Sequence, residues 1–130
     1  LFVAYRNDLS EVSNVVHGNY RARWEAGDPV LLAGMQRLRE ITLEGRECLL
    51  RRDWRRLGQL IDENFDTRAG MTRLDPRNVE MVNLARKLGA PAHYAGSGGS
   101  ILGIYRDEAH FQALREAFAE HSCNLIKPIL

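Results

Sequence analysis

The sequence predicts an α+β protein in which a small antiparallel sheet carries helices, and three observations support this class. Short apolar runs that suit strands occur at the start of the chain, around residue 100 and at the end. Helical periodicity fills most of the sequence between them. A glycine-rich segment separates two of the apolar runs by about the length of a hairpin turn.

The first part of the chain predicts a strand followed by a capped helix. Residues 1–6 (Leu-Phe-Val-Ala-Tyr-Arg) form the apolar run that predicts the strand. Ser10 can cap a helix that ends near Gly27, because glycine commonly follows the last helical turn. Its apolar positions are Val12, Val16, Tyr20 and Trp24.

Aspartate capping signals mark the starts of the next three helices. Asp28-Pro29 places a cap before proline at the first helical position, and the apolar face that follows holds Leu31, Met35, Leu38, Ile41, Gly45 and Cys48. Asp53 can cap a helix whose apolar stripe is Trp54, Leu57, Ile61 and Phe65. Asp75-Pro76 repeats the first signal before Met81, Val82, Ala85 and Leu88, and Gly89 is its C-terminal stop. Because Trp24 and Trp54 lie on apolar faces, we expect both in a core or a domain interface.

After Pro91 the pattern changes to strands. Residues 92–95 and 101–106 predict two strands around the glycine-rich segment, and residues 123–127 predict a final strand. Between them Asp107 can cap a helix with the apolar positions Phe111, Leu114, Ala117 and Phe118. The order is strand, helices, strand, strand, helix, strand. This order predicts a ferredoxin-like split β-α-β antiparallel sheet with extra helices in the first crossover and helices on one face.

Composition limits the classes of partner. The net charge of the 130 residues is +1, so bulk charge favours neither nucleic acid nor an acidic membrane as a partner. Cys48 and Cys123 form no metal-binding or redox motif, and they suit buried thiols in a reducing compartment, although a disulfide is also compatible with the sequence. No signal peptide and no membrane-spanning run is visible, so we expect a cytoplasmic protein. Since the chain opens in a strand without Met, we expect a piece of a longer protein.

The segment Ala95-Gly96-Ser97-Gly98-Gly99-Ser100 is the strongest candidate for a ligand site. A dinucleotide fingerprint would need glycine where Ile101 stands and a helix after it, and a phosphate loop would need a lysine, which is absent nearby. Two interpretations remain. The glycines either serve only the geometry of a hairpin turn, or they let backbone N–H groups approach a ligand closely.

Three motifs in order resemble the C-terminal half of the GHMP kinases, the superfamily of galactokinase, homoserine kinase, mevalonate kinase and phosphomevalonate kinase. The first motif is Leu-Gly-Gln-Leu at 57–60 with Asn-Phe-Asp-Thr-Arg at 64–68. The second runs from Asn-Val-Glu-Met at 78–81 to Gly-Ala at 89–90. The third is the glycine-rich segment, which stands where the family has a Thr-Gly-Ala/Ser-Gly-Gly-Gly loop, with departures at Ala95, Ser97 and Ser100. Within the superfamily the motifs are most similar to the sugar-1-kinase branch, especially glucuronokinase-like members.

The resemblance implies that residues 1–130 are the C-terminal domain of a two-domain, ATP-dependent small-molecule kinase. In this family the phosphate loop belongs to the N-terminal half. It implies transfer of the γ-phosphate to a hydroxyl of a sugar or sugar acid, with ATP and Mg²⁺ bound mainly by the N-terminal domain. That domain and a small-molecule substrate are the implied partners, and a homodimer is compatible with the resemblance. We therefore expect no catalytic residue within these 130 residues and no activity from them alone. The alternative is a non-catalytic ferredoxin-like module that binds a ligand or a partner.

The resemblance also implies site residues. Gly96, Ser97, Gly98, Gly99 and Ser100 would line the cleft for the nucleotide and the acceptor. Asn64 and Arg68 would lie on the acceptor side, where Arg68 could pair with a sugar carboxylate or phosphate. For both residues a plain helix-surface role is the alternative.

Other polar clusters suggest structural roles. His17, His93, His110 and His121 have no carboxylate or cysteine at metal-ligand spacing, so we expect no zinc site, and only His93 stands close to the glycines. Arg51, Arg52, Arg55 and Arg56 form a basic cluster without the aromatic residues of a nucleic-acid site. A solvated helix junction is the favoured interpretation of this cluster.

Overall fold

The computed structural model describes residues 1–7, 20–96 and 98–129. The chain divides into two compact units, the first formed by residues 1–11 and 74–130 and the second by residues 12–73. In sequence, the second unit is inserted between the first strand and the rest of the first unit. The predicted cap Ser10 and the positions Val12 and Val16 lie outside the described residues.

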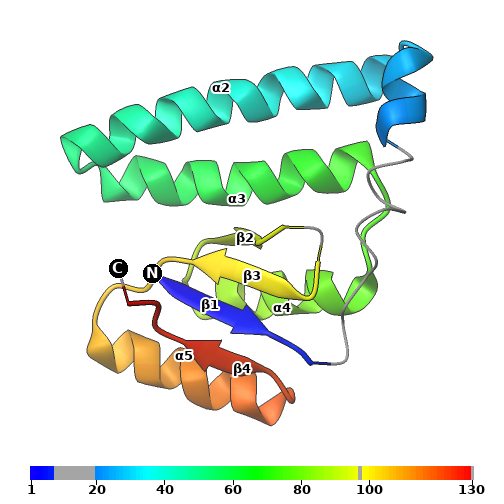
Figure 1. The fold of residues 1–130 in the computed structure, drawn as a ribbon. Coiled ribbons are helices and arrows are strands. Elements are labelled where there is room, and N and C mark those ends of the chain that lie inside the picture. Colours follow the sequence, from blue (N-terminus) through cyan, green and yellow to red (C-terminus); the bar gives the residue numbers. More distant parts are fainter. Residues whose placement is uncertain (8–19, 97, 130) are drawn as a thin grey trace. The chain divides into compact units, whose positions relative to one another are not determined.

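The first unit contains a four-stranded sheet in the order β2-β3-β1-β4, and every neighbouring pair is antiparallel. The strands are β1 (Phe2–Tyr5), β2 (Ala92–Tyr94), β3 (Ser100–Gly103) and β4 (Asn124–Ile126). Figure 1 shows β1 between β3 and β4. The α+β class and the ferredoxin-like strand order predicted from the sequence are confirmed, although each strand is shorter than predicted.

The largest difference concerns β3, which ends at Gly103 and not at residue 106. One further bond, from the Ile104 N–H to the Pro91 carbonyl oxygen (3.1 Å), lies beyond Gly103, and the chain then leaves the sheet. The Arg106 N–H donates to His110 Nδ1 (3.1 Å), because the chain here turns into the next helix. At Tyr105 the apolar character reflects packing on this helix, because its ring lies 5.1 Å from that of Phe111.

Two helices, α4 (Pro76–Lys87) and α5 (Glu108–Glu120), pack on the sheet. Alternate strand residues face them, and the Phe2 ring lies 6.3 Å from that of Phe118 on α5. Burying apolar side chains between sheet and helices supplies the main stabilisation of such a layer. The buried residues of the strands are Phe2, Ala4, Ala92, Tyr94, Ile101, Gly103 and Leu125.

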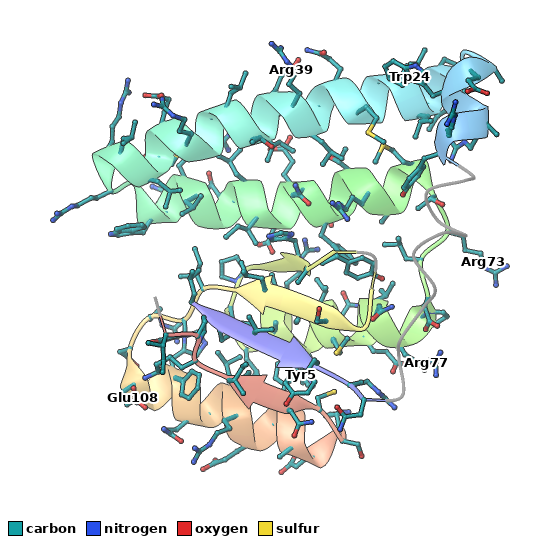
Figure 2. All side chains as sticks on the ribbon, in the orientation of Figure 1. Tyr5, Trp24, Arg39, Arg73, Arg77 and Glu108 are labelled. Atoms are coloured by element: carbon teal, nitrogen blue, oxygen red, sulfur yellow. The ribbon has the colours of Figure 1, made fainter. Side chains whose placement is uncertain are left out.

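The second unit contains α2 (Pro29–Arg51) and α3 (Trp54–Met71), which pack side by side, with residues 20–25 also helical (Figure 1). A buried cluster of Ile41, Cys48 and Leu60 joins them. Arg39 points away from α3 (Figure 2). The predicted helix end near Gly27 is confirmed by its positive φ of 69°.

All four predicted aspartate caps are confirmed. Each side chain accepts a hydrogen bond from a backbone N–H of the first helical turn, which satisfies a donor that the helix itself leaves open. The caps are Asp28, Asp53, Asp75 and Asp107.

Of the two predicted places for Trp24 and Trp54, a core or a domain interface, the core is wrong, and the domain interface stays a prediction. Their exposed fractions are 57% and 55%. Trp54 is the first residue of α3 and Trp24 lies in the short helical segment before α2, so each stands at a helix end, where few neighbours are available. Helical periodicity identifies an apolar face but not whether another element covers its ends.

Cys48 and Cys123 are buried, and neither is in a disulfide. In the described ranges, no helix combines the length and the apolar character that crossing a membrane requires.

Candidate functional site

The glycine turn (residues 96–100) joins β2 to β3, as the sequence predicts. The Ala95 N–H donates to the Ser100 carbonyl oxygen (3.0 Å), and the Ser100 hydroxyl donates to the Ala95 carbonyl oxygen (3.1 Å). These two bonds close the base of the hairpin. Ser97 lies outside the described residues.

Three glycines of the turn have backbone conformations that residues with a side chain rarely adopt. Their φ angles are +81° at Gly96, +137° at Gly98 and +78° at Gly99. A Cβ would strain the backbone at each position. The geometry of the turn therefore requires its glycines, whether or not a ligand also approaches them.

Gly99 is buried, and both of its backbone polar groups are used inside the protein. Its N–H donates to Oδ1 of Asn78 (2.8 Å), and its carbonyl oxygen accepts from the Arg6 N–H (3.1 Å). The turn is thus tied to the first turn of α4 and to the segment after β1. The Gly99 N–H is not available to a ligand in this conformation.

Asn78 is the functional candidate that sequence reasoning missed. Its side chain is only 1% exposed. It stands at the third position of α4, in register with Met81, Val82 and Ala85 on the buried face of that helix. An amide at an otherwise apolar helical position was the available signal, but its partner lies 21 residues away and cannot be found from periodicity.

The contact between Asn78 and the turn leaves little space. A Cβ on Gly98 would lie 3.0 Å from Nδ2 of Asn78. By contrast, a Cβ on Gly96 would meet nothing within 4 Å. Gly98 therefore has a steric reason to be glycine in addition to its φ.

A cavity of about 460 Å³ lies in the first unit along one side of α4. Arg6 is one of the residues that line it, and the backbone N–H of Arg6 also donates to the Gly99 carbonyl oxygen of the turn. Its charged lining is mostly basic, with a single carboxylate. The charged and imidazole groups are Arg6, Arg77, Lys87, His121 and Glu80.

The guanidinium group of Arg77, in this lining, is paired with Asp75. Arg77 donates to both carboxylate oxygens of Asp75, at 3.1 and 2.8 Å. The hydrogen bond from the Arg77 side chain, followed by the one from its backbone N–H, lowers the pKa of Asp75. Asp75 is therefore a charged cap at the start of the helix that carries Asn78.

Asn64 and Arg68, the predicted acceptor residues, are both on α3 and one helical turn apart, so they share a face. Oδ1 of Asn64 has no hydrogen-bond partner within the part of the chain that the structure describes. These residues belong to the second unit, whereas the glycine turn belongs to the first.

The histidines that the structure describes have structural surroundings. His110 is 6% exposed; its Nδ1 accepts from the Arg106 N–H, so Nε2 carries the proton and donates to the Leu88 carbonyl oxygen (3.0 Å). His93 pairs with Leu102 across the sheet. No group of three His, Cys, Asp or Glu within the described ranges could hold a metal ion.

The predicted basic cluster lies at the junction of α2 and α3. Arg51, Arg52 and Arg55 are exposed, while Arg56 donates to Glu44 on α2 (2.6 Å). This arrangement agrees with a solvated helix junction.

The fold has a counterpart among solved kinases. The crystal structure of L. major mevalonate kinase in complex with R-mevalonate matches 98% of this chain and 42% of its own chain, with a TM-score of 0.76 and 20% identity. At that identity the match establishes the fold, an α+β domain of the kind found in this small-molecule kinase.

Sequence comparison gives the family. The family model described as "GHMP kinases C terminal" matches residues 46–122. The chain belongs to the GHMP kinase family and contains its C-terminal domain. This family is the one that the three sequence motifs resemble.

Two relatives from Arabidopsis thaliana have more specific names. "Probable glucuronokinase 2" is 35% identical over 99% of this chain, and "Glucuronokinase 1" is 36% identical over 78% of it. The chain spans 36% and 29% of the length of these relatives, about a third.

Proposed function

We propose that the whole protein transfers the γ-phosphate of ATP to a hydroxyl group of a sugar acid, with glucuronate as the first substrate to test. The observation that carries this proposal is the 35% identity to a probable glucuronokinase over 99% of the chain. The family membership supplies the reaction class, and the names of the relatives supply the substrate class.

The glycine turn contributes backbone to the proposed acceptor cleft. Phosphoryl transfer depends mainly on positioning and on neutralising charge. Because both backbone polar groups of Gly99 bond to Asn78 and Arg6, we assign the contact with the substrate to the other turn residues, Gly96, Ser97, Gly98 and Ser100. The Ser100 hydroxyl already donates to Ala95, so it would accept a hydrogen bond from the substrate. The missing Cβ atoms would allow close approach of the substrate to the backbone.

Arg68 is our candidate for recognising the carboxylate of the sugar acid, with Asn64 beside it. A guanidinium group can donate two parallel hydrogen bonds to a carboxylate, which a lysine cannot do. The open acceptor on Asn64 Oδ1 suits a sugar hydroxyl.

We assign ATP and Mg²⁺ mainly to an N-terminal domain of the whole protein. When bound, the metal ion would neutralise charge on the phosphates. Within the described ranges, no three His, Cys, Asp or Glu side chains are grouped as a metal-ligand set.

The test is a coupled ADP-release assay on the full-length protein. We expect ATP-dependent turnover with glucuronate, and much less with galactose, mevalonate or homoserine. Residues 1–130 alone should show none, because the family's phosphate loop is not among them. Full-length protein that turns over none of the sugar acids would disprove the proposal, as would turnover by residues 1–130 alone.

An Arg68→Lys variant tests the carboxylate contact. We expect KM for glucuronate to rise about tenfold or more, since a charge-assisted bidentate pair is replaced by a single contact. KM for ATP should stay unchanged. Equal KM values for glucuronate in both proteins would remove Arg68 from the site.

A further inference from the structure

We propose that Asn78 is a positioning residue: its side chain fixes the conformation in which the glycine turn faces the substrate. The inference rests on the proposed function for its catalytic consequence. Its structural part stands on the contacts of Asn78 itself.

The burial of Asn78 needs an explanation. In the described part of the chain, the buried polar side chains are Asn78 and His110. Burying an amide without hydrogen bonds is unfavourable, and an apolar side chain would suit this face of α4 better. The amide is compensated by a specific partner, the Gly99 N–H at 2.8 Å.

The amide bonds to one residue of the turn and lies close to the residue before it. Oδ1 holds the Gly99 N–H, and Nδ2 occupies the space into which a Gly98 side chain would project, 3.0 Å from the Cβ position. A turn built on three residues with positive φ has many accessible conformations when it is unfolded or loose. The hydrogen bond that Asn78 of α4 accepts from the Gly99 N–H selects one of these conformations.

Asn78 is itself held firmly. Proline at the first position of α4 and the Asp75 cap fix the start of the helix, and the Asn78 N–H donates to the Asp75 carbonyl oxygen (3.0 Å). On the other side, the Arg6 N–H holds the carbonyl oxygen of Gly99. The turn is therefore held at Gly99 from two sides, by α4 and by the segment after β1.

The test uses three variants of the full-length protein. Asn78→Leu keeps the size and removes the acceptor. Asn78→Asp keeps an oxygen that can accept from Gly99. His110→Gln is the matched control, because His110 is the other buried polar side chain and it bonds to backbone groups of Arg106 and Leu88, not of the turn. All are assayed at a temperature at which circular dichroism shows them folded.

We expect Asn78→Leu to lower kcat about a hundredfold, the effect of a misplaced positioning group. Asn78→Asp should recover most of this loss, and His110→Gln should leave kcat within about twofold of wild type while lowering the melting temperature. Similar kcat values for Asn78→Leu and His110→Gln would overturn the inference.

A second readout does not depend on activity. Hydrogen–deuterium exchange of the peptide that contains Gly99 should be faster in Asn78→Leu than in wild type and unchanged in His110→Gln. Unchanged exchange in Asn78→Leu would also overturn the inference. If wild type phosphorylates no sugar acid, the proposed function fails, and the exchange result alone decides the role of Asn78.

Discussion

At the scale of single residues, comparing Gly96 with Gly98 distinguishes two reasons for glycine, namely backbone strain and steric contact. Both have positive φ, but only Gly98 lies against Asn78. Glycine in sequence is ambiguous, because a turn, a close approach and a ligand site all select it. In this chain the first two reasons are visible at Gly98.

We therefore expect Gly98→Ala to destabilise the protein more than Gly96→Ala. A strained backbone costs about 1–3 kcal/mol per residue, and Gly98→Ala adds the displacement of Asn78. Urea unfolding of the two variants measures the difference. Combining Gly98→Ala with Asn78→Ala should give less than the sum of the two losses, and strict additivity would contradict the steric argument.

Residue-level prediction from sequence succeeded where the signal is local. The caps Asp28, Asp53, Asp75 and Asp107 act within three residues of themselves, so their spacing was sufficient evidence. Asn78 was missed because its partner is remote in sequence. The roles of the turn residues, Asn64 and Arg68 remain predictions.

At the scale of the elements, the packing of α2 on α3 depends on one glycine. A Cβ on Gly34 would overlap with Sδ of Met71, the last residue of α3. Gly70, one residue earlier, would place its Cβ in open space. The two glycines thus form a natural pair for comparison.

Gly34→Ala should lower the melting temperature, and Gly70→Ala should raise it. Alanine improves helix propensity by up to about 1 kcal/mol at either position. At Gly34 this gain is exceeded by overpacking against Met71, which costs about 1–3 kcal/mol. Differential scanning calorimetry of both variants checks the signs, and stabilisation by Gly34→Ala would show that Met71 moves aside freely.

The Asp75 cap gives α4 a pH dependence. Its pKa lies below the ordinary value of 3.8, mainly because of the Arg77 side chain. The charged cap therefore stabilises the folded state fully above pH 3.8, and this stabilisation disappears as the pH falls through the lowered pKa.

An Asp75→Asn variant isolates this contribution, because asparagine also caps helices but does not titrate. We expect wild type to be the more stable protein at pH 7 and the difference to shrink as the pH falls below about 3.8. Denaturant unfolding from pH 7 to pH 2.5 measures it. A difference that stays constant over this range would exclude the carboxylate as its source.

The ends of helices and the ends of strands were predicted from the sequence with different success. Helices were found with nearly correct starts because caps are local signals. Strand ends were predicted less well, because pairing stops where the partner strand ends. Residues 104–106 are apolar or follow apolar residues, but the Arg106 N–H donates to His110 and not to a neighbouring strand.

At the scale of the whole molecule, the order of the elements was enough to predict the fold class, and three sequence motifs were enough to predict the family. The order of the elements was not enough to predict which residues at the helix ends are covered by other elements. The exposed side chains of Trp24 and Trp54 are the example. Burial depends on elements that meet in space, and a periodic pattern carries no information about that.

The central place of β1 in the sheet has a consequence for how the protein folds. Phe2 pairs with Gly103 and Tyr5 pairs with Asn124, contacts that span more than about 100 residues of chain. Contacts of such high contact order form slowly, whereas the helical hairpin of α2 and α3 can form from local contacts soon after its synthesis. On a ribosome that adds about 5–20 residues per second, β1 emerges several seconds before β4 exists. During that interval both edges of β1 lack their partners, and unpaired strand edges of this kind are prone to aggregation.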